Sequence, residues 1–414
     1  MKKTIVIFSL LVGGIVYGQT VNNLDILFKA KQFNELNGLN TNFNHPDYYF
    51  YKAVYANVCN HPKLANEYLD SLQIWKISSG KLFDYWTLRN DCYVKLCDYK
   101  RAYNTNELLN RKFKEYYSTT ELAENIETEK IWKEASVIPA QRIEYKGMVI
   151  VPVVHDKAGL ITVKVTSNHQ VADFVFDTGA GLSVITESYA LKLGLKMYGK
   201  GDIKVKGFTG VGNITRIATT DSLKMGDVVI YHPLFIVFKD EALSFANGAY
   251  KINGIIGFPV AKDLGTIIIQ KNSLEIGHTK YEGHKNLFID MLNPIVMLKY
   301  RDKEYPFNLD TGADKTSLSK TFYELMKNDD LIKSLPVQIS KTASAGGEIN
   351  YKSLLIPTLG LQLGNQNIEF KNAKMDIDNY HISGKALFGN IGQDLLKKYD
   401  KIIISFDNNY LKLE

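Results

Sequence analysis

Two copies of the segment Asp-Thr-Gly-Ala are the residues of this sequence with the clearest potential for chemistry. One copy begins at Asp177 and the other at Asp310, in a chain of 414 residues. A single Asp-Thr-Gly segment usually forms a turn. Two carboxylates held a few ångströms apart cannot both ionise readily, so they would share one proton. One could then accept a proton from water while the other donates a proton to a carbonyl oxygen.

The sequence around the two aspartates is repeated, which predicts that similar elements position them. An apolar strand leads into each copy, and Gly254-Ile-Ile-Gly257 downstream of the first aligns with Ala386-Leu-Phe-Gly389 downstream of the second. The last glycines follow their aspartates by 80 and 79 residues, and an apolar strand, a turn and a short final strand come after each. The repeat predicts two similar β-rich lobes that bring both loops to a common pseudo-twofold axis.

The pattern of apolar and polar residues changes at two further points along the chain. Residues 1–18 place two lysines before a short apolar run, which is typical of a secretory signal peptide and predicts a secreted or periplasmic protein. Apolar positions recur three and four residues apart along 19–137, which predicts an α-helical domain. Short runs rich in Val, Ile, Phe and Tyr follow, and they predict all-β lobes over 138–283 and 284–414.

A weak internal repeat appears within the helical domain. Segments that begin at Pro62 and Tyr99, 37 residues apart, each follow another helix. This arrangement resembles tetratricopeptide-type (TPR-like) helix pairs, although the signature Trp, Gly and Pro positions of that repeat are not matched. Stacked helix pairs would offer a surface for a protein partner. A helical pro-segment is the alternative, and both interpretations stay open.

Composition and motifs exclude several other classes of function. The chain is 45% hydrophobic and 23% charged, with a formal net charge of +6, as in ordinary globular proteins. No basic tract interleaved with aromatic residues indicates nucleic-acid binding, and no later segment is apolar enough to span a membrane. The sequence lacks His-Glu-x-x-His, so a zinc peptidase would lack its ligands, and nothing suggests a nicotinamide or flavin cofactor; no metal or cofactor is expected. Cys59, Cys92 and Cys97 are expected to be small buried side chains, with a disulfide as the alternative.

From about Met148 to its end the chain resembles the aspartic peptidases, both retroviral-type and pepsin-like. Leu309–Asp314 looks like the retroviral-type active-site loop, and Phe176–Gly181 is a close variant. The resemblance implies an all-β bilobal double barrel, an active monomer, and Asp177 and Asp310 as the catalytic residues. It also implies a set of residues that support the two loops, namely Thr178, Gly179, Thr311, Gly312, Gly257 and Gly389.

The same resemblance implies a substrate-binding flap in each lobe. Glycine-rich segments lie between apparent strands, with Phe208, Thr209 and Gly210 in the first lobe and Gly346 and Gly347 in the second. Ordinary hairpin turns are the alternative interpretation.

Alanine follows each Asp-Thr-Gly segment where many pepsin-like enzymes carry Ser or Thr. The missing hydroxyl at Ala180 and Ala313 removes a hydrogen bond that would favour the ionised carboxylate. We therefore expect activity at mildly acidic to near-neutral pH rather than in strong acid.

Taken together, these features predict a secreted aspartic endopeptidase that hydrolyses peptide or protein substrates. A water molecule activated between Asp177 and Asp310 would attack the peptide bond. The alternative is a non-catalytic peptide-binding protein that retains the two-lobed fold. Both Asp-Thr-Gly segments are intact, which favours the enzyme.

Overall fold

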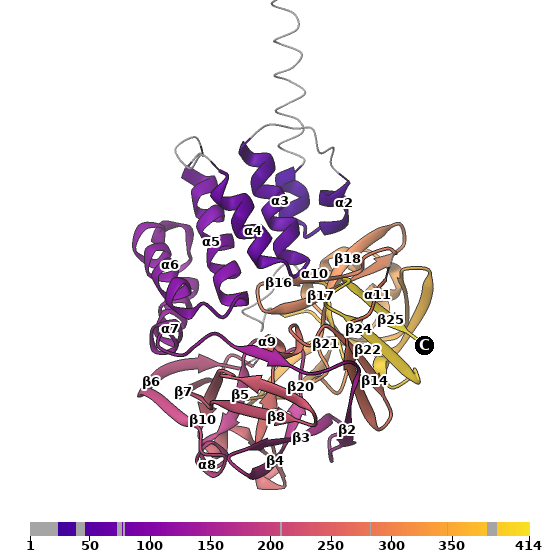
Figure 1. The fold of residues 1–414 in the computed structure, drawn as a ribbon. Helices are drawn as coiled ribbons and strands as arrows, with labels where there is room; N and C mark the ends of the chain where they lie inside the picture. Colours follow the sequence, from indigo (N-terminus) through magenta and orange to yellow (C-terminus); the bar gives the residue numbers. More distant parts are fainter. Residues whose placement is uncertain are drawn as a thin grey trace, which may run out of the picture.

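The computed structural model describes most of the chain, in eight segments: 24–38, 46–72, 77, 79–207, 209–281, 283–345, 347–378 and 387–414. The expected signal peptide at 1–18 lies outside the described residues, as do Phe208, Gly346 and Ala386. Helices come first and strands follow (Figure 1), which confirms the expected change from a helical to a strand-rich part. No helix among the described segments is long and apolar enough to cross a membrane.

The helical part is a series of helix–turn–helix pairs. Residues 24–29 are helical, and the later helices are α2 (Phe33–Asn37), α3 (Pro46–Val58), α4 (Pro62–Asp70), α5 (Ser79–Lys95), α6 (Tyr99–Lys112) and α7 (Thr119–Ala135), with a short 3-10 turn at Lys114–Tyr116. Three turns share a left-handed residue, namely Lys31, Asn60 and Cys97. In each, the next residue donates its N–H to the carbonyl five positions earlier, at 2.8 to 2.9 Å. This capping pattern ends a helix and reverses the chain, so the three turns have one design.

Sixteen strands form two sets of eight that pair in the same order. The first strand series runs β2 (Val149–His155), β3 (Ile161–Ser167), β4 (Gln170–Phe176), β13 (Gly254–Ile256), β5 (Ser183–Thr186), β10 (Phe235–Phe238), β7 (Gly212–Thr219) and β6 (Lys196–Lys206). The second strand series runs β16 (Leu287–Asp290), β17 (Asn293–Tyr300), β18 (Lys303–Leu309), β23 (Gly389–Ile391), β19 (Ser317–Leu318), β22 (Gln366–Asp376), β21 (Gly347–Leu363) and β20 (Gln338–Ser344). The parallel pairs also match, since β4–β13 corresponds to β18–β23 and β5–β10 to β19–β22. The second series therefore repeats the topology of the first.

Smaller elements complete the strand-rich part. β8 (Ser222–Met225) pairs with β3 and with β9 (Val228–Tyr231), and β9 also pairs with β1 (Arg142–Glu144). β11 (Ser244–Phe245) and β12 (Tyr250–Lys251) form a separate two-stranded sheet. The short helices are α8 (Glu187–Lys192), α9 (Phe258–Ala261), α10 (Lys320–Met326), α11 (Asp330–Ser334) and α12 (Gln393–Leu396), with 3-10 turns at Asp240–Leu243 and Ala246–Gly248.

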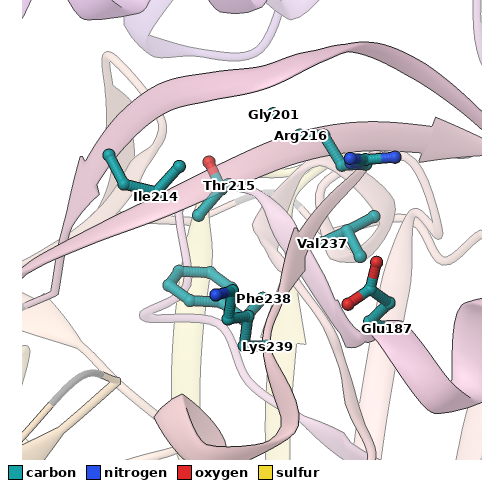
Figure 2. Close-up of a pocket in the computed structure, with 8 residues that line it drawn as sticks. All are labelled: Glu187, Gly201, Ile214, Thr215, Arg216, Val237, Phe238 and Lys239. Atoms are coloured by element: carbon teal, nitrogen blue, oxygen red, sulfur yellow. The ribbon is translucent and has the colours of Figure 1, made fainter.

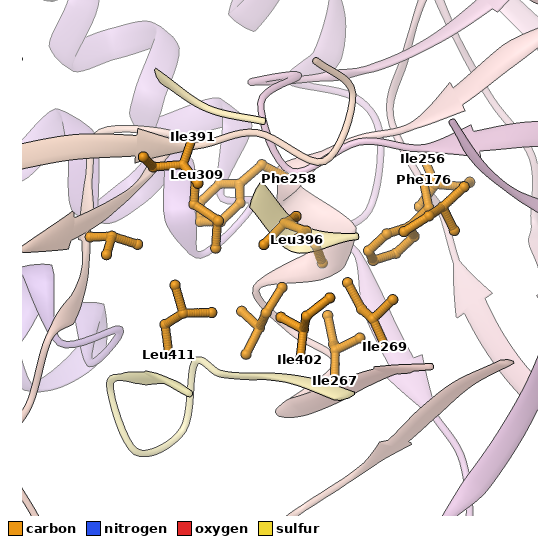
Figure 3. Close-up of a cluster of buried hydrophobic side chains, with 14 of the residues drawn as sticks. Phe176, Ile256, Phe258, Ile267, Ile269, Leu309, Ile391, Leu396, Ile402 and Leu411 are labelled. Carbon is orange, nitrogen blue, oxygen red and sulfur yellow. The ribbon is translucent and has the colours of Figure 1, made fainter. Parts of the chain in front are cut away.

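Two corresponding strands join the halves. β14 (Thr266–Gln270) pairs antiparallel with β24 (Lys401–Ser405), and Ile268 lies opposite Ile403. β15 (Ser273–Gly277) and β25 (Tyr410–Leu413) flank this pair, and β15 also pairs with β2. One apolar cluster spans the junction (Figure 3), and it includes Phe176, Ile256, Ile267, Leu309, Ile391 and Ile402. Burial of these side chains holds the two strand series in one orientation.

The helical part packs on both strand series. Phe33 and helix α3 cover the buried side chains Phe288, Ile295 and Met297 of β16 and β17. At the other end, Trp132 of α7 belongs to a cluster with Ile203 and other side chains of β6, β7 and β10. Figure 1 shows the helices as a layer over both groups of strands. The helical part therefore buries apolar surface that the strands would otherwise expose.

The three cysteines lie in this helical part. Cys59, Cys92 and Cys97 are all buried and free. The expectation of small buried side chains is confirmed, and the disulfide alternative is wrong.

Deletion of residues 1–137 is expected to destabilise the strands. It exposes at least Phe288, Ile295, Met297 and Ile203, each now at most 1% exposed, and each such side chain contributes about 1.5–3 kcal/mol through burial. We expect aggregation or a lower melting temperature, measured by size-exclusion chromatography and thermal unfolding, while deletion of 1–18 leaves both unchanged. A monomeric 138–414 fragment with the melting temperature of the longer chain would contradict this packing.

Candidate functional site

Each Asp-Thr-Gly segment begins where a buried central strand ends. Asp177 follows β4 and Asp310 follows β18. The N–H of Asp177 donates to the carbonyl of Ile256 at 3.0 Å, and the N–H of Asp310 donates to that of Ile391 at 2.9 Å. Because β13 and β23 are themselves central strands, these bonds fix both aspartates to the rigid core of their series.

Thr178 and Thr311 fasten the two loops to each other. Thr178 Oγ1 donates to the carbonyl of Leu309 at 2.7 Å and accepts the N–H of Thr311 at 3.1 Å. Thr311 Oγ1 donates to the carbonyl of Phe176 at 2.8 Å and accepts the N–H of Thr178 at 3.0 Å. Both threonines are fully buried. Four reciprocal hydrogen bonds therefore hold the loops together out of contact with water.

The carboxyl groups of Asp177 and Asp310 face each other above these threonines. A Cβ built on Gly179 would overlap the carboxyl carbon of Asp310, and one built on Gly312 would overlap that of Asp177. Only glycine fits such a close approach. Within its own loop, each glycine donates its N–H to Oδ1 of the preceding aspartate, at 2.7 Å to Asp177 and 2.9 Å to Asp310. Both aspartates remain partly exposed, so water can reach them.

This environment raises the pKa of both carboxyl groups. Burial, and then the negative charge of Asp310, hold the pKa of Asp177 well above its usual value, against the opposing N–H of Gly179. Burial also raises the pKa of Asp310, while the amide of Asn390 and the hydrogen bond with Asp177 oppose that rise. The two groups titrate as a coupled pair that retains a proton above the usual range of an aspartate.

The site also includes two asparagines, which the sequence analysis did not identify. Asn390 in β23 donates its amide N–H to Asp310 Oδ2 at 2.8 Å, and Asn308 in β18 donates to Asn390 Oδ1 at 2.7 Å. The sequence did carry a sign of them, because Asn390 is a polar residue within an otherwise apolar strand segment. An amide in such a segment needs a hydrogen-bond partner.

The alignment of Gly389 with Gly257 is wrong. Gly257 donates its N–H to Ser183 Oγ, and Gly392 makes the same bond to Thr316 Oγ1, both at 3.0 Å. Gly392 is therefore the supporting glycine of the second loop, and it follows its aspartate by 82 residues, where Gly257 follows by 80.

Gly389 occupies a different position. A Cβ on Gly389 would meet the ring of Phe307, as one on Gly254 would meet the ring of Phe174. The equivalent segments are thus Gly254–Gly257 and Gly389–Gly392. The error arose because Asn390 interrupts the pair of apolar residues by which the segment was recognised.

The glycine-rich segments expected to be flaps lie at the tips of two hairpins, β6–β7 and β20–β21. Thr209 donates its N–H to Ser344 Oγ at 2.9 Å, and the two hydroxyl oxygens are 3.0 Å apart. The turns place Gly210 at φ +76° and Gly347 at φ +154°, which favour glycine. The two hairpins, one from each strand series, therefore touch at their tips.

Helix α7 holds the first of these hairpins. Glu124 forms an ion pair with Lys206 at 2.9 Å, and Glu127 accepts the backbone N–H of Lys204 at 2.8 Å. The helical part thus contacts β6 directly beside the hairpin tip.

Two cavities lie away from the aspartates. The cavity in Figure 2 has a volume of about 70 Å³ and is lined by Glu187, Gly201, Ile214, Thr215, Arg216, Val237, Phe238 and Lys239. A second, of about 290 Å³, is lined by Asn60, His61, Pro62, Lys63, Lys95, Leu96, Lys262 and Asp263. Its buried lysines are neutralised by ion pairs, Lys95 with Asp91 and Lys262 with Asp263. Neither lining set includes an Asp-Thr-Gly loop.

Replacement of Thr178 by Val is expected to loosen the connection between the loops. It leaves the buried N–H of Thr311 and carbonyl of Leu309 without this partner, at a cost of about 1–3 kcal/mol for each group. Urea unfolding measures the loss. Thr162→Val is the matched control, because its buried hydroxyl makes one long bond of 3.4 Å. Equal losses in the two variants would contradict the interlock.

The raised pKa of Asp177 predicts how stability varies with pH. The folded state keeps the proton above the pKa of about 3.8 that applies when unfolded, so this contribution is complete below that pKa and is lost as pH rises through the folded pKa. Relative to wild type, Asp177→Asn should therefore gain free energy of unfolding from about pH 4 upward.

The exposed Asp173 on the same strand, paired with Lys164, provides the control Asp173→Asn. Chemical unfolding at several pH values measures all three proteins. A pH-independent difference between Asp177→Asn and wild type would show that Asp177 titrates normally.

The family model described as Aspartyl protease matches residues 161–260. This range contains Asp177 and Gly257 and ends before Asp310. Comparison of the chain with curated proteins found no match. The match shows that residues 161–260 are similar to an aspartyl protease domain.

Proposed function

We propose that this protein is a secreted aspartic endopeptidase that cleaves peptide bonds with water activated between Asp177 and Asp310. The observation that carries the proposal is the placement of the two carboxyl groups face to face, each against the glycine of the opposite loop. The reciprocal threonine bonds and the raised pKa of Asp177 support the same reading.

The reaction needs one proton on the pair at its start. The ionised carboxylate removes a proton from water as the water oxygen bonds to the peptide carbonyl carbon, and the protonated carboxyl donates its proton to the carbonyl oxygen. A neutral tetrahedral diol results. As the carbon–nitrogen bond breaks, the first carboxyl passes its proton to the departing nitrogen, and the second recovers one from a hydroxyl of the diol. The pair again holds one proton, and the products are an acid and an amine.

The two hairpins would serve as paired flaps over an extended peptide. Their contact through Thr209 and Ser344 supports this role, because the two strand series contribute one hairpin each. The tips must separate to admit a substrate, and Gly210 and Gly347 supply backbone freedom at these turns. One chain would supply both loops and both flaps, and would therefore act as a monomer in a bilobal double barrel.

The helical part would remain attached in the active enzyme. Its buried contacts with β16, β17 and β6 favour an integral brace over a removable pro-segment. The three turns of shared geometry support TPR-like helix pairs, whose exposed side would receive a protein partner. The leading 1–18 segment would direct export and be removed as a signal peptide.

Replacement of either aspartate tests the activity. Asp177→Asn and Asp310→Asn should each reduce cleavage of an unfolded peptide substrate by about 10²–10⁴-fold or more, since each removes one proton-transfer group. Mass spectrometry of the products measures cleavage between about pH 4 and pH 8, with the optimum expected in mildly acidic to near-neutral solution. Asp173→Asn is the control.

Two outcomes would overturn the proposal. Undiminished cleavage by either aspartate variant would rule out the shared mechanism. Peptide binding by the wild-type protein with no cleavage at any pH would favour the non-catalytic peptide-binding protein.

A further inference from the structure

We propose that Asn308 and Asn390 place the shared proton on Asp177, so that Asp310 is the base that deprotonates water and Asp177 is the acid that protonates the carbonyl oxygen. The roles of base and acid rest on the proposed function, whereas the location of the proton is a property of the folded protein itself. The two asparagines act through Asp310 and are positioning residues.

The amide chain is oriented toward an ionised Asp310. Asn390 Nδ2 lies 2.8 Å from Asp310 Oδ2, and Asn308 Nδ2 lies 2.7 Å from Asn390 Oδ1. An amide nitrogen can only donate, and an ionised carboxylate can only accept. The reverse orientation of Asn390 would set two acceptors against each other unless Asp310 carried the proton. The chain therefore matches the carboxylate form of Asp310.

The first strand series lacks this chain at the equivalent positions. Asn308 pairs with Asn390 in the β18–β23 register, and Val175 pairs with Ile255 in the β4–β13 register. Neither Val nor Ile has a side-chain donor, whereas both aspartates accept the N–H of the second residue after them. The two Asp-Thr-Gly loops repeat each other, but the strands beside them differ, because only the second series carries the asparagine pair.

The groups that face Asp310 come from three elements. Asp177 faces it from the opposite loop, Asn390 from β23, and the N–H groups of Gly312 and Ala313 from its own loop. Among these groups, Asn390 is the neutral donor that has no counterpart beside Asp177. Its amide stabilises the charge on Asp310, and that charge in turn favours the proton on Asp177.

Nearby charged residues are engaged elsewhere or face solvent. Asp394 of α12 accepts the N–H and the hydroxyl of Thr316, each at 2.7 Å. Asp314 and Lys315, just beyond the loop, are exposed. Water therefore screens the charges of Asp314 and Lys315.

Asn308 carries an energetic penalty that packing alone does not explain. Its Oδ1 is buried and finds no hydrogen-bond partner among the described residues. Such an atom is unfavourable in a protein core, and Val fills the corresponding position in the first series. A role in orienting Asn390 accounts for the presence of an amide at this position.

The test replaces the two asparagines of the second strand series with the apolar residues that stand at the corresponding positions of the first. The double variant Asn308→Val/Asn390→Ile and the single variant Asn308→Val are compared with wild type, and the single variant also removes the unpaired oxygen. Carboxyl carbons of ¹³C-labelled aspartate are titrated by NMR in the full chain, and Asp177→Asn and Asp310→Asn assign the signals. The buried Asn286, which binds the backbone of Leu411, provides the control Asn286→Leu.

In wild type, Asp310 should ionise first and Asp177 should retain its proton to higher pH. The double variant should raise the lower pKa of the pair by about one unit, a tenfold change in proton affinity, and shift the acidic limb of kcat/KM by the same amount. The single variant should shift both in the same direction by less, and Asn286→Leu should shift neither.

An unchanged lower pKa in the double variant, or a wild type in which Asp177 ionises first, would overturn the assignment. The titration needs no turnover, so it separates this inference from the proposed activity. A wild type that titrates as expected but cleaves no peptide would leave the proton on Asp177 and refute the peptidase. Cleavage with an acidic limb that does not move would refute the role of the asparagines.

Discussion

The reciprocal hydrogen bonds between Thr178 and Thr311 are the constraint on which the candidate site depends. Each threonine joins the loop of one strand series to the backbone of the other. Because both side chains are fully buried, separating the loops would leave their polar groups unpaired in an apolar setting. The same constraint presses Gly179 and Gly312 against the opposite carboxyl groups. The repeated topology of the two series serves to bring these short segments together.

The repeated topology does not make the two halves chemically equal. The amides of Asn308 and Asn390 stand where the first series has apolar side chains, and Asn390, which accepts from Asn308, donates to Asp310 alone of the two aspartates. The helical part adds a second asymmetry, since α7 binds the β6–β7 hairpin through Glu124 and Glu127. The two halves therefore differ beside the aspartates, where an acid and a base would have to be distinguished. They also differ at the hairpins, where the two flaps would have to be distinguished.

The Asp-Thr-Gly segments could be predicted from the sequence because geometry at the loop contact admits few alternatives to Thr and Gly. Gly392 could not be found by the same pattern, since Asn390 replaces an apolar residue of the motif. The apolar strand after each repeated segment was predicted, but the pairing of these two strands, β14 and β24, and the contact of Thr209 with Ser344 depend on tertiary packing between distant segments. The packing of the helices on both strand series could not be predicted from the sequence either, because an apolar helix face does not show which surface it will cover.

The central claim is that Asp177 and Asp310 hold one proton between them in a single site. A neutron crystal structure at mildly acidic pH tests this most directly, because it locates deuterons on carboxyl oxygens. The account predicts one deuteron on the pair and a water molecule within hydrogen-bond reach of both carboxyl groups. Two fully ionised carboxylates, or carboxyl groups too far apart to share a water molecule, would contradict it.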